Sequence, residues 1–305
     1  MGDPRPIGFF DSGVGGLTVL REVIRRLPSE DTLYLGDNDR TPYGPRSDAE
    51  VLRFSSECLD ELARRDVKAI VVACNTSTAV ALPSLRRRYA VPILGVVRPG
   101  ATAAALATRT RSVGVIATPA TVRSHAYFEA IKEEDPFVEV YEHATPELVP
   151  LVEAGQLDGP VVEAAVRRSL SPLLGSETIG QADGSGADES FVFPMPNGAR
   201  IDTLLLGCTH YPLIGSVIRD IVGPSTAVID SATATASALA SLIEVHDLAA
   251  PDRERGRHVM LTTGDVHAFS DTATRLFGPE FSSVGGIDVA GSSEIDHVPV
   301  AAGAP

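Results

Sequence analysis

Two of the three cysteines in this 305-residue chain follow buried strands at matched positions. The apolar run 69–73 has no polar alternation, which is typical of a strand buried on both faces, and Cys74 follows it. The run 201–207 leads to Cys208 in the same way. The third cysteine, Cys58, lies in a helical apolar pattern and is expected to be a packed core thiol. Because open α/β sheets bind ligands at the carboxyl ends of their strands, Cys74 and Cys208 are candidate catalytic groups.

Each candidate thiol has a neighbour that could move its proton. Only a few per cent of an ordinary thiol is ionised at neutral pH, so a cysteine base needs its thiolate favoured or made on demand. His210 stands two residues after Cys208, and Asp11 ends the strand expected to neighbour that of Cys74. Both cysteines are expected to open a helix, whose dipole favours the anion. One thiol on each face of a carbon atom would remove a proton from one side and return one on the other, which is stereoinversion.

Composition excludes several classes of function. The net charge of −14 argues against a nucleic-acid partner, since such binding needs lysine and arginine to neutralise phosphates. No apolar run approaches the ~18 residues of a membrane span, and we expect no secretory signal at the N-terminus. The odd number of cysteines predicts free thiols in a reducing cytoplasm. Lys68 and Lys132 are the only lysines, which argues against a pyridoxal-type cofactor held as a Schiff base.

Strands and helices are expected to alternate along nearly the whole chain, which predicts parallel sheets joined by right-handed crossovers. The length favours two domains. We expect an α/β protein with two doubly wound domains, whose largely parallel sheets face each other across an interdomain cleft. Residues 1–97 together with 211–290 are assigned to the first domain, and residues 98–210 to the second. A surface insertion is expected at 175–199 and a disordered tail at 291–305.

Five sequence blocks resemble the glutamate racemases of the aspartate/glutamate racemase superfamily. They are FDSGVGGLT at 10–18, PYG at 42–44, ACNT at 73–76, PLVEAG at 150–155 and LGCTHYP at 206–212. Weaker matches at 228–231 and 262–265 extend the similarity to about residue 290. The resemblance implies cofactor-independent racemisation of L- and D-glutamate in the cytoplasm, with no metal. It also implies that the reaction supplies D-glutamate for peptidoglycan synthesis.

The resemblance further assigns roles to single residues. It implies that Cys74 acts on the D-enantiomer with Asp11 beside it. It implies that Cys208 acts on the L-enantiomer, assisted by His210 and Glu153. The residues implied in substrate binding are Ser12, Tyr43, Gly44, Asn75, Thr76, Thr121 and Thr209. The chain departs from the family at TPAT (118–121), where a Glu-Gly or similarly small pair usually precedes the threonine, and this departure bears on the role of Thr121.

Other functions stay open at the level of sequence. A metal site built from Cys74, Cys208 and His210 is disfavoured, because closed zinc sites use four ligands, often in closely spaced cysteine pairs. A non-catalytic binder of an acidic amino acid would keep the cleft without the chemistry, although both thiols are present. An aspartate racemase of the same superfamily is the nearest enzymatic alternative. Glu153, taken alone, is also explained as an acid at a helix start. The sequence does not fix the oligomeric state, and a homodimer is among the assemblies it allows.

Overall fold

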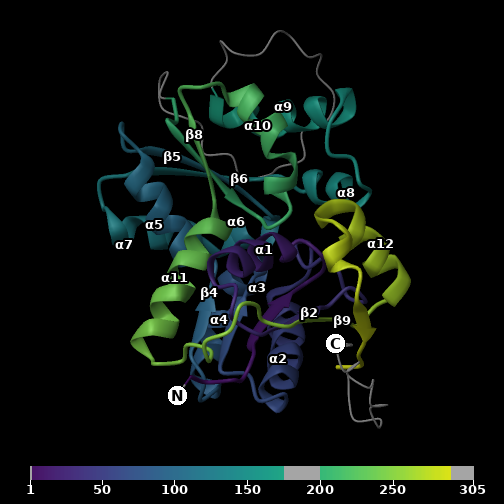
Figure 1. The fold of residues 1–305 in the computed structure, drawn as a ribbon. Helices are drawn as coiled ribbons and strands as arrows, with labels where there is room; N and C mark the ends of the chain where they lie inside the picture. The colour runs from purple at the N-terminus through teal and green to yellow at the C-terminus, as the bar shows by residue number, and fades with distance from the viewer. Residues whose placement is uncertain (1, 175–199, 290–305) are drawn as a thin grey trace.

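The computed structural model describes residues 2–174 and 200–289 of the chain. The insertion expected at 175–199 and the tail expected at 291–305 lie outside the described residues. The described part folds into two parallel β-sheets, each with helices on both faces (Figure 1). The expected α/β class with two doubly wound units is therefore confirmed. No helix in the described ranges is long and apolar enough to cross a membrane.

The first sheet has six parallel strands in the order β10-β9-β2-β1-β3-β4. Their bounds are β1 (Ile7–Asp11), β2 (Thr32–Gly36), β3 (Ala69–Val72), β4 (Ile93–Gly95), β9 (His258–Thr262) and β10 (Val284–Gly286). β1 lies between β2 and β3, and all of its residues are buried. The carboxyl ends of β1 and β3 are therefore neighbours, which brings Asp11 and Cys74 to one edge of the sheet. The sequence does not predict β10, since three residues that include two glycines carry no strand pattern.

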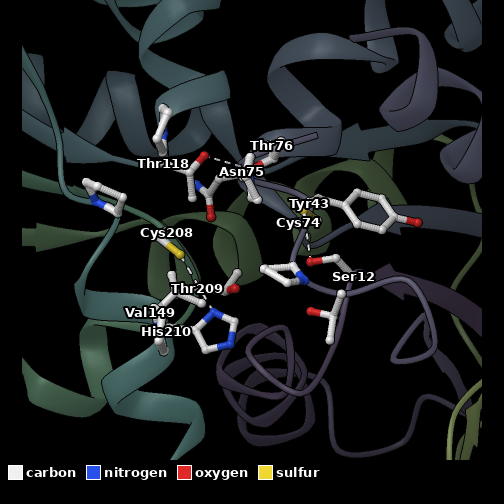
Figure 2. A pocket seen from close by; sticks show the side chains of 17 residues that line it. Ser12, Tyr43, Cys74, Asn75, Thr76, Thr118, Val149, Cys208, Thr209 and His210 are labelled. Atoms are coloured by element: carbon white, nitrogen blue, oxygen red, sulfur yellow. Dashed lines mark hydrogen bonds between the residues drawn. The ribbon is translucent and has the colours of Figure 1, made fainter. Parts of the chain in front are cut away.

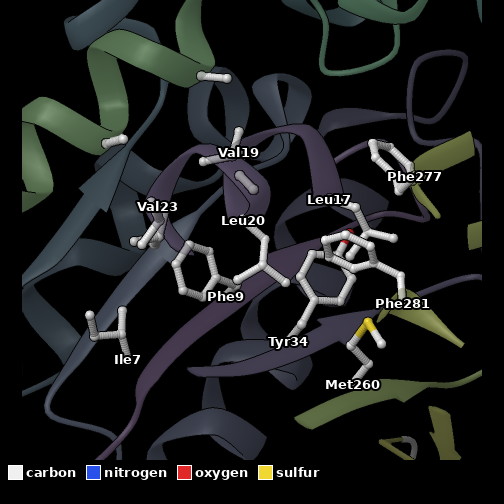
Figure 3. Close-up of a cluster of buried hydrophobic side chains, with 14 of the residues drawn as sticks. Ile7, Phe9, Leu17, Val19, Leu20, Val23, Tyr34, Met260, Phe277 and Phe281 are labelled. Atoms are coloured by element: carbon white, nitrogen blue, oxygen red, sulfur yellow. The ribbon is translucent and has the colours of Figure 1, made fainter. Parts of the chain in front are cut away.

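Helices cover both faces of this sheet. One face carries α1 (Leu17–Arg26), α11 (Ser231–Val245) and α12 (Val266–Phe277), followed by the short turn η3 (Pro279–Phe281). The other face carries α2 (Asp48–Arg64), α3 (Asn75–Val80) and α4 (Leu82–Leu85), with the turn η1 (Arg86–Arg88) after them. Figure 3 shows the core on the first face, where Phe9, Leu20 and Tyr34 are fully buried. Burying each such side chain stabilises the fold by roughly 1.5–3 kcal/mol, so the sheet is a rigid platform for the loops at its carboxyl edge.

A buried ion pair lies near the opposite edge of the same sheet. Lys68 Nζ is 2.5 Å from Glu30 Oε2, and the two side chains are only 0% and 5% exposed. Lys68 also donates to the carbonyl oxygen of Asp3, and Glu30 accepts from the backbone N–H of Ala250. Because these residues stand just before β2 and β3, this lysine joins the amino ends of the strands and lies away from their carboxyl ends.

The second sheet has four parallel strands in the order β6-β5-β7-β8. Their bounds are β5 (Ser112–Ala117), β6 (Glu139–Ala144), β7 (Thr203–Gly207) and β8 (Ala227–Asp230). One face packs against α5 (Val97–Ala107) and α7 (Ala126–Glu134). The other packs against α8 (Leu148–Glu153), α9 (Pro160–Leu174), η2 (Tyr211–Ile214) and α10 (Gly215–Val222). The short helix α6 (Pro119–Ser124) follows β5 directly.

The strand pairing places the boundary between the two units later than the sequence predicts. The sequence assigns residues 211–230 to the first domain, but β8 pairs with β7, and α10 packs in the core of the second sheet. The chain therefore crosses to the second sheet after β4 and returns at α11 (Figure 1). A four-residue strand such as β8 carries no mark of its partner in its own sequence, which is why the sequence does not reveal this pairing.

Candidate active site

A cavity of about 190 Å³ lies between the carboxyl edges of the two sheets. Its walls are formed by the segments that follow β1, β2 and β3 of the first sheet and β5, β6 and β7 of the second. Both cysteines predicted from the sequence line it, and Figure 2 shows them entering from different segments of the chain. Seven further predicted residues also line it: Ser12, Tyr43, Gly44, Asn75, Thr76, Thr209 and His210. Clefts that hold drug-sized ligands measure about 300–1,000 Å³, so this cavity suits a smaller molecule.

Cys74 caps the amino end of α3, as the sequence predicts. Its Sγ accepts a hydrogen bond from the backbone N–H of Ser77 at 3.4 Å and lies 3.6 Å from the Oγ of Ser12. Burial and the nearby carboxylate of Asp11 raise the pKa of Cys74 to about 11, although the contacts with Ser77 and Ser12 act in the opposite direction. At neutral pH this residue therefore carries its proton.

Asp11 lies behind Cys74 and does not line the cavity. The residue is completely buried. Its Oδ2 accepts from the backbone N–H groups of Gly13 at 3.1 Å and Gly16 at 3.0 Å, while its Oδ1 has no hydrogen-bond partner among the described residues. Burial raises the pKa of Asp11, and the positive charge of His210 opposes this change. Asp11 is thus a carboxyl group with one free oxygen beside the cavity wall.

Two side chains, His210 and Glu153, lie in series beside the Cys208 thiol. The Nδ1 atom of His210 lies 3.7 Å from Cys208 Sγ, and its Nε2 atom lies 3.2 Å from Glu153 Oε1. Burial lowers the pKa of His210, but its contacts with Cys208 and Glu153 outweigh burial and raise the pKa to about 10. At neutral pH, a protonated imidazole therefore lies beside the second thiol.

The segment after Cys208 differs from the helix that the sequence predicts there. The turn η2 begins at Tyr211, and α10 begins only at Gly215. The positive charge beside Cys208 therefore comes from the His210 side chain, whereas Cys74 lies at the amino end of the helix α3. The interpretation of Glu153 as an acid at a helix start is wrong, because Glu153 is the last residue of α8.

Comparison with known proteins gives the family. The model of the Asp/Glu/hydantoin racemase family matches residues 11–179, more than half of the chain. The chain belongs to this family. A curated glutamate racemase from Geobacter metallireducens is 41% identical over 280 residues, which cover 92% of this chain and 95% of the relative.

Solved structures agree with the family. A glutamate racemase isoform from Bacillus anthracis matches with a TM-score of 0.83 and 39% identity, covering 93% of this chain and 97% of that one. A glutamate racemase from Francisella tularensis in complex with D-glutamate matches with a TM-score of 0.78 and 30% identity, covering 94% of this chain and 99% of that one. The protein is therefore an enzyme of the racemase class.

Three residues that the resemblance implicates lie outside the cavity of this racemase. They are Asp11, Glu153 and Thr121. Thr121 is fully buried, and its hydroxyl lies 3.0 Å from that of Thr118, which in turn lies 2.9 Å from that of Thr76. Thr121 therefore orients two hydroxyls that do reach the cavity.

Two side chains at the cavity wall have partners outside it. The hydroxyl of Tyr43 donates to the buried carboxylate of Asp37, so this tyrosine offers the cavity its ring and backbone (Figure 2). The amide nitrogen of Asn75 donates to the hydroxyl of Tyr127 at 2.6 Å, while its Oδ1 has no partner among the described residues. Asn75 therefore has a free acceptor at the cavity wall.

The racemase cavity includes residues that sequence reasoning missed. They are Thr41, Pro42, Pro45, Thr118, Pro119, Pro146, Val149 and Pro150. Thr118 had a signal, because it follows the apolar strand β5 and precedes a proline that begins α6. Val149 had none, since it is one of several apolar residues in α8.

The chemistry of the wall is mostly neutral. Among the described residues that line the cavity none is a lysine or arginine, and His210 is the only side chain there that can be cationic. The alternative of a metal site finds no support in the geometry, because the described ranges contain no cluster of three or more histidine, cysteine or acidic side chains able to hold a metal ion. A ligand with carboxylates would therefore be held by hydroxyls, amides and backbone N–H groups.

Proposed function

We propose that this racemase interconverts L- and D-glutamate with two cysteine thiols and no cofactor, in the cytoplasm, and so supplies D-glutamate for peptidoglycan synthesis. One observation carries the proposal: Cys74 and Cys208 come from different sheets and line the same small cavity. The names of the relatives at about 40% identity, and the D-glutamate bound in one of the similar structures, support glutamate as the substrate.

The two thiols differ in a way that fits the division of labour. His210 is a cation at neutral pH and stabilises a thiolate at Cys208, which would remove the Cα proton of L-glutamate. Cys74 keeps its proton, because burial raises its pKa to about 11, and would deliver it to the opposite face of the same carbon. In the reverse direction Cys74 takes the proton from D-glutamate. We assign Asp11, the carboxyl group beside Cys74, to assist this step. We assign Glu153 to hold the imidazole ring of His210.

The substrate groups would be recognised by the neutral wall. The free Oδ1 of Asn75 is an acceptor for the α-ammonium group. The hydroxyls of Thr76, Thr118 and Thr209 can donate to carboxylate oxygens, and so can the backbone N–H of Gly44. Apart from His210, whose charge has Glu153 as its partner, the wall offers neutral donors to an anionic substrate.

A chiral assay with matched cysteine variants tests the proposal. The purified enzyme is incubated with L-Glu, D-Glu, L-Asp and D-Asp in turn, and the enantiomers are separated by chiral chromatography. We expect interconversion of glutamate, its loss in Cys74→Ala and in Cys208→Ala, and its retention in Cys58→Ala. Cys58 is the matched control, because it is a buried thiol in α2 that does not line the cavity. Continued interconversion in either cavity variant, or a preference for aspartate, would overturn the assignment.

The cellular role needs a separate measurement. Expression of the gene should restore growth of a bacterial strain that requires external D-glutamate, and the Cys208→Ala variant should not. Growth of the strain with that inactive variant would contradict the assignment.

A further inference from the structure

Tyr127, a tyrosine of α7, contacts the residues next to both cavity cysteines. The side chain is 0% exposed and does not line the cavity. Its hydroxyl accepts a hydrogen bond from Asn75, the residue directly after Cys74, at 2.6 Å. Its ring packs against Gly207, the residue directly before Cys208, where a Cβ atom would lie only 2.9 Å from the Cε2 of Tyr127. Tyr127 therefore touches both halves of the site from behind the cavity wall.

The side chain of Asn75 depends on this tyrosine for its orientation. Asn75 is the first residue of α3, so the helix fixes its backbone. In the described part of the chain its side-chain amide has one hydrogen-bond partner, the Tyr127 hydroxyl, which binds Nδ2. The buried Oδ1 has none, and the residue lines the cavity. Because the two ends of an amide are similar in size, this one bond determines which end faces the ligand.

The Tyr127 hydroxyl is a neutral group at physiological pH. Burial raises the pKa of Tyr127, and the contacts of its hydroxyl with Asn75 and Ser231 oppose this change without cancelling it. A neutral hydroxyl can donate its single proton and accept another hydrogen bond at the same time. The hydroxyl can therefore donate to the side chain of Ser231 while it accepts from Asn75.

We propose that Tyr127 is a positioning residue that makes the site select ligands with an α-ammonium group, because it holds the amide oxygen of Asn75 toward the substrate. The inference rests on the proposed function, which assigns the ammonium group to this oxygen. A ligand without the ammonium group leaves Oδ1 buried and unpaired, which weakens its binding. Without the Tyr127 hydroxyl the amide can turn its nitrogen to the cavity, and a nitrogen donor cannot pair with an ammonium group.

Tyr127→Phe tests the hydroxyl alone, because the ring against Gly207 remains. We expect KM for both glutamate enantiomers to rise about tenfold, since a buried polar group has lost its partner. The kcat should change little, because the ammonium contact is made in the ground state and in the transition state alike. A variant with an unchanged KM, or one in which only kcat falls, would overturn the proposal.

Tyr89→Phe is the matched control variant. It also removes a tyrosine hydroxyl that donates a hydrogen bond, here to Asp60 at 2.7 Å, and Tyr89 does not line the cavity. Its KM and kcat should equal those of the wild type. A tenfold rise of KM in this variant would show that the loss of a remote hydroxyl is enough, and would remove the support for Tyr127.

Glutarate is the matched control ligand, because it has the carbon chain and both carboxylates of glutamate but no ammonium group. Its inhibition constant against racemisation should be the same in Tyr127→Phe as in the wild type, or lower, since an amide nitrogen at the cavity can donate to a carboxylate. A purely structural role of Tyr127 would weaken glutamate and glutarate by the same factor. That result would overturn the proposal.

A double-variant cycle shows whether Tyr127 acts through Asn75. Calorimetry gives the dissociation constant of D-glutamate, with Cys208→Ala present throughout so that the ligand is not converted. Tyr127→Phe should weaken binding about tenfold when Asn75 is present and should have no further effect in Asn75→Ala. The same loss in both backgrounds would overturn the proposal. Absence of racemisation in the wild type would instead refute the proposed function, so the two failures are distinguishable.

Discussion

Alkylation of Cys74 offers a direct measure of the electrostatics of the cavity. Iodoacetamide reacts with the thiolate, and a thiol with a pKa of about 11 is ionised to only about one part in 10³ at pH 8. The alkylation rate of Cys74 in the free enzyme should therefore rise about tenfold for each pH unit from 7 to 10, without the plateau that a thiol of ordinary pKa near 8.5 would show. Digestion and mass spectrometry would follow the peptide that contains residue 74.

Two variants should change this rate in opposite directions. Asp11→Asn removes a negative charge that raises the pKa of Cys74, so alkylation at pH 8 should become faster. Ser12→Ala removes a contact that lowers the pKa of Cys74, so alkylation should become slower. Cys58 is the internal control, because burial shields it and raises its pKa, and it should react only after unfolding. A plateau near pH 8.5 in the wild type, or slower alkylation in Asp11→Asn, would refute this account of Cys74.

Three further outcomes are expected. The pKa of His210 is about 10 in the folded enzyme against about 6.5 when unfolded, so its contribution to stability is complete below pH 6.5 and is lost as pH rises through about 10. The difference in unfolding free energy between the wild type and His210→Asn should therefore shrink over that interval in urea titrations, and a constant difference would contradict the assignment. Lys68→Met leaves the buried Glu30 without its cation and should lower the free energy of unfolding by about 3–5 kcal/mol. Adding Glu30→Gln in the double variant should restore part of this loss. A loss near zero in Lys68→Met would show that the pair is not buried in solution. Racemisation should continue unchanged after exhaustive chelation and after hydroxylamine treatment, and activity that returns only on adding metal or pyridoxal phosphate would disprove cofactor independence.

Much of the site follows from patterns that are local in the sequence. A buried strand without polar alternation fixes where the chain reaches the sheet edge, and this pattern alone places both Cys74 and Cys208 at such an edge. The alternation of strand and helix patterns likewise predicts the α/β class. The glycine-rich turn after β1 is expected to form a tight entry to a helix, and its N–H groups hold Asp11.

The rest depends on partners far apart along the chain. The hydroxyl of Tyr43 points away from the cavity because it donates a hydrogen bond to Asp37, which Arg40 and Thr263 also contact. Glu153 reaches His210 from the second sheet's α8, outside the substrate cavity, a position that no spacing in the sequence encodes. Tertiary contacts set where these side chains point. Local sequence patterns therefore predict which segments form the cavity wall, but they predict less well which atoms face the ligand.

The pairing of β2 with β9 means that β2 is synthesised long before the strand it pairs with. Thr32 and His258 are partners in register, although 226 positions separate them along the chain. A ribosome adds about 5–20 residues per second, so β2 waits roughly 10–45 s for this neighbour. During that interval the backbone N–H and C=O groups on its outer edge are open, and such an edge pairs readily with strands of other chains. The nascent chain is therefore prone to aggregation between the synthesis of β2 and that of β9, while the first sheet is incomplete. Slower translation lengthens this interval.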